Sequence, residues 1–222
     1  MSYERLLIWL IIGIIGITLF STFMTMLMIN DNGITGKVTA TGTTTTTLNG
    51  SAGISLTDNA IAFGSGYYDA SCTSGKAILD SFVPEQTCWI NTTEYLTSSD
   101  YHTIRNSGTT LLNVTADTDQ TSGEALFCGS DGGCLATNFY TMVRYKTQDT
   151  TGEAGSCNTG LVSSWTNILV GDGEPSSTAD VCDNLNFEDE NDEVNVYYEF
   201  TVPMDATSGE KTLTVTYTGV AL

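Results

Sequence analysis

EVNVYYEFTVP, residues 193–203, and KTLTVTYTGV, residues 211–220, are the most regular stretches of this chain. Apolar side chains recur at every second position in both, and most of them are β-branched or aromatic. This pattern is typical of a β-strand that buries one face. We expect the two strands to form a pair, in which Val194, Val196, Tyr198, Phe200 and Val202 pack against Leu213, Val215 and Tyr217.

Shorter stretches with the same alternation precede these two strands, separated by Gly, Asn, Asp and Ser residues. Their repetition at short spacing predicts an all-β sandwich. Thr is β-branched and favours extended backbone, so the Thr-rich residues 34–50 are predicted to form a strand or an extended linker. The alternating stretches are residues 51–66, 109–117, 138–147 and 166–173.

Residues 66–100 are less regular than the rest of this half of the chain, and they hold Trp89 and two cysteines. The absence of clear alternation argues against a simple hairpin. We therefore expect an insertion in the β-sandwich whose conformation is held by a disulfide.

An uncharged apolar run, residues 6–29, stands at the start of the chain. With a rise of about 1.5 Å per residue, a helix over this run would reach about 36 Å, enough to cross a bilayer core of about 30 Å. A cleaved signal peptide is the alternative, although such signals have a shorter apolar core and a small-residue cleavage site. We predict a transmembrane or filament-core helix in residues 1–30 and an extracellular β-sandwich domain in residues 31–222. Arg5 precedes the run, so the positive-inside rule places the N-terminus in the cytoplasm before assembly.

Thr18, Ser21, Thr22 and Thr25 would share one face of the predicted helix, and Gly13 and Gly16 add flat patches to the helix. Such residues let membrane helices approach closely and form hydrogen bonds with each other, although they can also bond to their own backbone. We predict that this face packs against copies of itself. The residues concerned are Gly13, Gly16, Thr18, Ser21, Thr22 and Thr25.

The formal net charge of −19 limits the classes of partner. A nucleic-acid-binding surface needs Lys and Arg to neutralise phosphates, and this chain has only seven such residues against 26 acidic ones. Anionic lipid headgroups are disfavoured for the same reason. The composition is consistent with a solvated exterior, a salty medium or cation binding.

The six cysteines all follow the apolar run, on the side predicted to be external. An even number of cysteines in an oxidising compartment indicates disulfides, whereas zinc sites usually contain closely spaced Cys pairs and His ligands. Proximity in the sequence favours the pairs Cys72–Cys88, Cys128–Cys134 and Cys157–Cys182. Three N-glycosylation sequons lie on the same side, at Asn49, Asn91 and Asn113.

Catalytic motifs are missing from the sequence, and His102 is its single histidine. It lies in a turn-like stretch, and we expect a surface or loop residue rather than a member of a catalytic triad. No cofactor motif is present, so we predict a protein that is not an enzyme and has no cofactor.

Calcium is the one ligand that the acidic residues suggest, because it prefers carboxylate and carbonyl oxygens. The weak candidates are Glu188, Asp189 and Asp192 in the segment NLNFEDENDEVN, with Asp172 and Glu174 as a lesser group. No EF-hand spacing is present, and a solvated loop is the alternative.

Two stretches resemble archaeal type IV pilins and archaellins. ERLLIWLIIGIIGI, residues 4–17, looks like the start of a mature pilin helix, with Glu4 at the edge of the apolar run. Residues 193–218 are similar to the last hairpin of the immunoglobulin-like, antiparallel β-sandwich of archaeal secreted proteins. The resemblance implies a structural subunit of a pilus-like filament, a homo-oligomer with helices in its core and acidic, glycosylated heads outside. The alternative is a single-pass surface protein, an adhesin or an envelope or virion component, that binds through its head.

Overall fold

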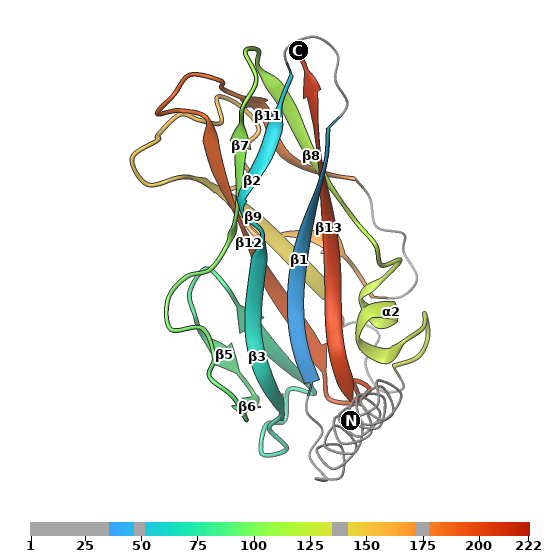
Figure 1. Ribbon diagram of the computed structural model, residues 1–222. Coiled ribbons are helices and arrows are strands. Elements are labelled where there is room, and N and C mark those ends of the chain that lie inside the picture. The colour runs from blue at the N-terminus through green and yellow to red at the C-terminus, as the bar shows by residue number, and fades with distance from the viewer. Residues whose placement is uncertain (1–35, 47–51, 135–141, 172–177) are drawn as a thin grey trace, which may run out of the picture. The chain divides into compact units, whose positions relative to one another are not determined.

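The computed structural model describes residues 36–46, 52–134, 142–171 and 178–222. The chain divides into two units, Met1–Gly33 and Ile34–Leu222, and the fold described here is that of the second. Its strands form two β-sheets that face each other across one hydrophobic core (Figure 1).

The first sheet has six strands, and the long C-terminal strand β13 lies inside it between β8 and β1. β13 runs antiparallel to β8 and parallel to β1, with Gly36 opposite Gly209 and Thr46 opposite Gly219. Figure 1 shows β1 and β13 side by side along their length. In order across the sheet, the strands are β11 (Ala179–Leu185), β8 (Leu112–Thr118), β13 (Gly209–Ala221), β1 (Gly36–Thr46), β3 (Ala60–Tyr68) and β6 (Trp89–Asn91).

The second sheet is built around β12 (Glu193–Pro203), which pairs with β9 along one edge. Its other edge is shared by two short strands, with β7 against residues 193–196 and β4 against residues 199–203. Ser81 bridges the gap between them, because its backbone N–H donates to the Tyr198 carbonyl and its hydroxyl accepts from the Tyr198 N–H. The other strands are β10 (Thr166–Leu169), β9 (Met142–Asp149), β4 (Lys76–Asp80), β5 (Gln86–Thr87), β7 (His102–Asn106) and β2 (Ile54–Asp58).

The core lies between the two sheets and is filled by the residues that alternate along their strands. Leu112, Val114 and Ala116 of β8 are fully buried, as their spacing predicts. Phe63 of β3 meets Phe200 of β12 edge-to-face, with 5.1 Å between ring centroids, and so joins the two sheets. Burial of such large apolar side chains is the main favourable contribution to the folding of a sandwich.

The two C-terminal strands do not form the expected hairpin. β12 and β13 are connected by only five residues, yet they belong to opposite sheets and face each other across the core. Either arrangement buries the apolar face of both strands, so alternation alone does not distinguish pairing within a sheet from facing between sheets. The parallel β1–β13 pairing also makes the first sheet mixed rather than antiparallel.

The predicted fold class, an immunoglobulin-like antiparallel sandwich headed by a long apolar helix, is therefore wrong for this structure. Within the described ranges the helix found is α2 (Gly123–Cys128), which has six residues. No helix in those ranges is long and apolar enough to cross a membrane. The helix expected in residues 1–30 lies outside the described residues.

Residues 66–100 are not an insertion, which corrects a second expectation. They supply β4 and β5 to one sheet and β6 to the other, and β4 lies directly beside the central strand β12. Their irregular appearance in the sequence arises because these strands are two to five residues long, too short to show a period of two.

Three disulfides join Cys72 to Cys88, Cys128 to Cys134 and Cys157 to Cys182, which are the pairs that proximity in the sequence predicts. They lie in different parts of the domain. The Cys128–Cys134 bond closes the loop after α2, where Gly129 adopts a left-handed conformation (φ 85°) and donates its N–H to the Ala125 carbonyl. The Cys157–Cys182 bond ties the segment after β9 to β11.

The longer disulfide loop is expected to contribute more stability. Cys157 and Cys182 are 25 residues apart in the sequence, and replacing both by Ala should lower the free energy of unfolding by about 3.5 kcal/mol. Cys128 and Cys134 are six residues apart, and replacing both by Ala should lower it by about 2 kcal/mol. Urea unfolding of the two double variants measures the difference. A larger loss in the Cys128/Cys134 variant would contradict this ranking.

Candidate functional site

The chain enters the β-domain at one end of the first sheet, and its acidic segment lies at the opposite end. Gly36 is level with Gly209, which follows directly after the turn from β12 into β13. β12 begins at Glu193 and runs to that turn, so its start is about 35 Å away at about 3.3 Å per residue. The acidic residues before Glu193 are thus remote from the point of entry.

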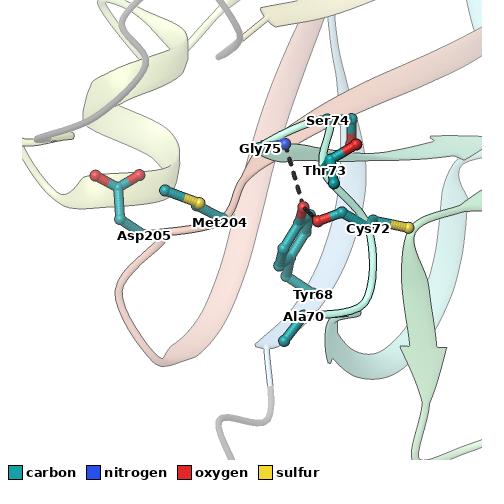
Figure 2. A pocket seen from close by; sticks show the side chains of 8 residues that line it. All are labelled: Tyr68, Ala70, Cys72, Thr73, Ser74, Gly75, Met204 and Asp205. Carbon is teal, nitrogen blue, oxygen red and sulfur yellow. Dashed lines mark hydrogen bonds between the residues drawn. The ribbon is translucent and has the colours of Figure 1, made fainter.

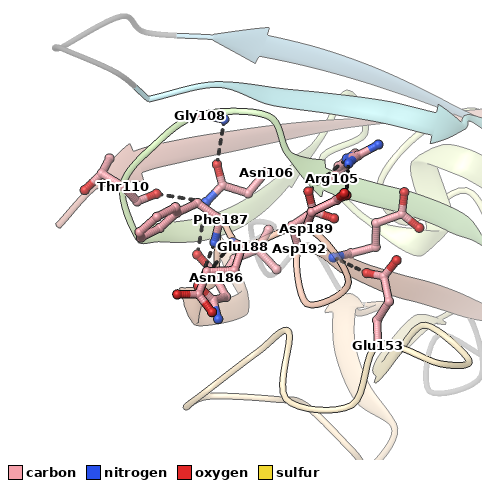
Figure 3. A network of polar contacts seen from close by, with 12 residues as sticks. Arg105, Asn106, Gly108, Thr110, Glu153, Asn186, Phe187, Glu188, Asp189 and Asp192 are labelled. Carbon is pink, nitrogen blue, oxygen red and sulfur yellow. Dashed lines mark hydrogen bonds and ion pairs between the residues drawn. The ribbon is translucent and has the colours of Figure 1, made fainter.

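At this distant end, Arg105 organises two of the acidic side chains. It lies on β7, opposite Glu193 in the strand register. Its Nε donates to Asp192 Oδ2 at 2.9 Å, and its Nη2 donates to Asp189 Oδ1 at 3.0 Å. Figure 3 shows the guanidinium beside both carboxylates. These two carboxylates raise the pKa of Arg105, Asp192 being the stronger influence, so the guanidinium stays charged.

Asp192 differs from its acidic neighbours because it is buried. Its residue exposure is 4%, and its Oδ1 atom has no hydrogen-bond partner among the described residues. Glu153 and Glu193 lie next to it, and one carboxylate oxygen from each of the three is within 4.8 Å of the others. We call Glu153, Asp192 and Glu193 the acidic triad.

The position of Glu153 depends on the segment between β9 and β10. Asp149, the last residue of β9, accepts the backbone N–H groups of Gly155 at 2.8 Å and Cys157 at 3.1 Å through its carboxylate. Ser156 donates its hydroxyl to the Glu153 carbonyl at 2.7 Å. Glu153 itself accepts the backbone N–H of Glu193 at 3.0 Å, which joins this segment to the start of β12 (Figure 3).

The surroundings of Glu193 shift the pKa of its carboxyl group. Partial burial, followed by the nearby Glu153 carboxylate, raises the pKa of Glu193, while Arg105 opposes the shift. A carboxyl group with a raised pKa in the folded state binds its proton more tightly there than in the unfolded chain. Its deprotonation therefore reduces stability as the pH rises above the ordinary range of a glutamate.

The structure only partly brings together the calcium candidates of the sequence. Glu188 is exposed, and the Asp189 side chain is 91% exposed and pairs with Arg105. Asp192 instead faces Glu153, which is distant in the sequence and which periodicity and motif spacing give no means of finding. Asp172 and Glu174 lie outside the described residues.

A second group of possible ligands, Cys128, Cys134 and Asp205, does not form a metal site. Its two sulfur atoms are bonded to each other as a disulfide, so neither is available as a thiolate. An open pocket nearby is lined by eight residues from the end of β3, the segment that follows it and the β12–β13 turn (Figure 2). Tyr68 organises it by donating to the Cys72 carbonyl and accepting from the Gly75 N–H. Asp205 is the only charged side chain in this lining, which offers no acid–base pair for catalysis.

His102 is a core residue, contrary to the expectation of a surface or loop position. It is fully buried on β7, and its Nδ1 lies 2.8 Å from the Tyr217 hydroxyl. The Tyr217 hydroxyl in turn contacts the Tyr198 hydroxyl at 2.5 Å. Burial raises the pKa of both tyrosines well above their ordinary value, so both stay protonated. The chain's single histidine is therefore part of a buried polar network.

Two of the three predicted glycosylation sites lie among the residues that the structure describes. Asn91 lies on β6 and Asn113 on β8, and both are half-buried. Asn113 alternates with the buried Leu112 and Val114, which places it on the outer face of the first sheet. Asn49 lies outside the described residues, as do the proposed helix-packing residues Gly13, Gly16, Thr18, Ser21, Thr22 and Thr25.

Comparison with protein-family models and with curated proteins finds no match for this chain. The resemblance to archaeal pilins and archaellins is therefore not tested and stays a prediction. The functional argument rests on the residues and geometry described above.

The buried network predicts unequal effects for two conservative changes. Tyr217→Phe removes the hydroxyl that contacts both His102 and Tyr198, and it should cost about 2–4 kcal/mol because two buried polar atoms lose a partner. Tyr198→Phe leaves the Tyr217–His102 contact in place and should cost about 1 kcal/mol. Chemical unfolding measures both, and equal losses would show that Tyr217 is not the central member.

Proposed function

We propose that the chain is a structural, non-catalytic subunit of an extracellular filament. In this proposal the apolar segment, residues 6–29, holds copies of the chain together. The acidic β-domain lies outside and faces the medium. The proposal follows the resemblance to archaeal pilins and archaellins and requires no cofactor.

The observation that carries it is the way the β-domain is attached. The first described strand, β1, has neighbours on both sides: β13 along residues 36–46 and β3 along residues 36–41. A pull on the preceding segment acts along β1, and the many bonds of the two ladders share that load instead of breaking one at a time. An attachment of this kind suits a subunit that must transmit force between a filament and its surroundings.

The disulfides support an extracellular location for the domain. Three cross-links occur in the described residues, and no free cysteine is found there. Such bonds form and persist in oxidising compartments and are rare in the reducing cytosol. The net charge of −19 is in keeping with a domain that remains solvated when many copies are crowded together.

The second candidate is a membrane-anchored surface protein that binds a partner through its head. One surface feature favours it. Lys146 of β9 lies 2.9 Å from the centroid of the Phe82 ring and 4.8 Å from that of Trp165. Both aromatic side chains are partly exposed, on the face of β9 opposite the core residue Tyr145. Aromatic side chains are enriched in protein interfaces, so this group offers a contact for a partner.

A pair of double variants distinguishes the two functions. Ser21→Leu with Thr22→Leu should abolish filaments, because larger side chains prevent neighbouring apolar segments from approaching closely. Ser21→Ala with Thr22→Ala is the matched control and should still assemble, since the side chains remain small. Electron micrographs of purified material give the result.

A surface anchor predicts a different outcome. Leu suits a lipid environment, so both double variants should then reach the membrane equally well. Wild-type material that contains only detergent-bound monomers would exclude the filament. Loss of partner binding in Phe82→Ala, with a normal far-UV spectrum, would then support the second candidate.

A further inference from the structure

The acidic triad combines three carboxylates from two segments that the fold holds against each other. Asp192 and Glu193 stand at the start of β12, where pairing with β7 and β9 sets the backbone. Glu153 comes from the segment between β9 and β10, which Asp149 and the Cys157–Cys182 disulfide hold in place. The ligand oxygens are therefore brought within 4.8 Å of one another by the fold rather than by chance motion of exposed side chains.

The independent sign of a ligand is the Oδ1 atom of Asp192. Arg105 satisfies Oδ2 of the same carboxylate, but Oδ1 has no hydrogen-bond partner among the described residues, and the side chain is only 5% exposed. Leaving a charged oxygen without a partner in a buried position is costly, and native proteins pair such atoms with a donor, water or ion. A cation coordinated by this oxygen removes that cost.

We propose that Glu153, Asp192 and Glu193 bind a divalent cation of the calcium type. Three carboxylates carry three negative charges, and Arg105 offsets one of them, which leaves two for the ion to neutralise. The ligands are oxygen atoms alone, which suits a hard cation and not zinc or copper. Calcium takes six to eight oxygens, so water and backbone carbonyls complete its coordination.

Binding at this site has a structural consequence at the end of the domain remote from Gly36. The ion joins the segment between β9 and β10 to the start of the central strand β12, adding to the hydrogen bonds from the Glu193 N–H to Glu153 and from the Thr150 N–H to the Glu193 carbonyl. Its positive charge also offsets the repulsion among the closely placed carboxylates. The site does not depend on the proposed filament, since it lies within one copy of the chain.

The test uses the chain of residues 1–222 with its disulfides intact and calcium chloride as the probe. Calcium at millimolar concentration should raise the Tm above that in sodium chloride of equal ionic strength, because a ligand that binds only the folded state stabilises it. Calorimetric titration should show a calcium site with a dissociation constant of about 0.1–1 mM, the range of extracellular modules.

Matched variants locate the ion. Asp192→Asn and Glu153→Gln should each weaken calcium binding by about tenfold or more, because each removes a charged ligand. Asp189→Asn makes the same change of charge at a neighbouring side chain outside the acidic triad, and it should alter the affinity by less than about threefold, as expected from its exposure to solvent.

Two results would overturn the proposal. Equal Tm changes in calcium and sodium salts would show screening only, and calcium binding retained in Glu153→Gln would place the ion elsewhere. Glu153 lies in a surface segment, so this variant should fold even if Asp192→Asn, at a buried position, does not.

Discussion

Burial of β12 on both of its faces is the constraint around which the second sheet is arranged. Every residue from Val194 to Pro203 is buried. One face carries Val194, Val196, Tyr198 and Phe200 into the core, as alternation requires. The other face carries Asn195, Tyr197 and Glu199, which must find partners because a buried polar group without one is costly. The neighbouring strands supply them: Thr103 donates to Asn195, and Arg144 pairs with Glu199.

The same constraint explains why two short strands share one edge of β12. β7 forms backbone hydrogen bonds with the first residues of β12, and β4 does so with its last residues. Between these two strands, Ser81 pairs with the backbone of Tyr198. The side chains of Phe82 and Tyr101, which lie near these strands, cover the Tyr197 ring edge-to-face at 4.9 and 5.1 Å. Segments that look irregular in the sequence are thus necessary parts of the sheet, because they cover the outward face of its central strand.

The register between β7 and β12 links this architecture to the acidic end of the domain. Because Arg105 lies opposite Glu193, its guanidinium reaches Asp192 and holds that carboxylate in a buried position. The segment carrying Glu153 is brought to the same place because β9 pairs with β12 and ends there. At the other end of the domain, β1 starts beside Gly209, which joins whatever precedes residue 36 to the middle of the first sheet. Attachment and acidic triad therefore occupy opposite ends of the domain.

The sequence by itself determined the β-rich class, the alternating core residues of β8, β12 and β13, and the three disulfide pairs. These features are local: a period of two shows which side chains are buried, and cysteines close in the chain pair readily. Only the tertiary structure decided that β12 and β13 face each other from opposite sheets, that β1 runs parallel to β13, and that His102 is buried. It alone placed Glu153 beside Asp192, across a separation in sequence that no local pattern spans. Periodicity identifies the buried face of a strand. Which strand lies beside it depends on how all the strands bury their apolar faces at the same time.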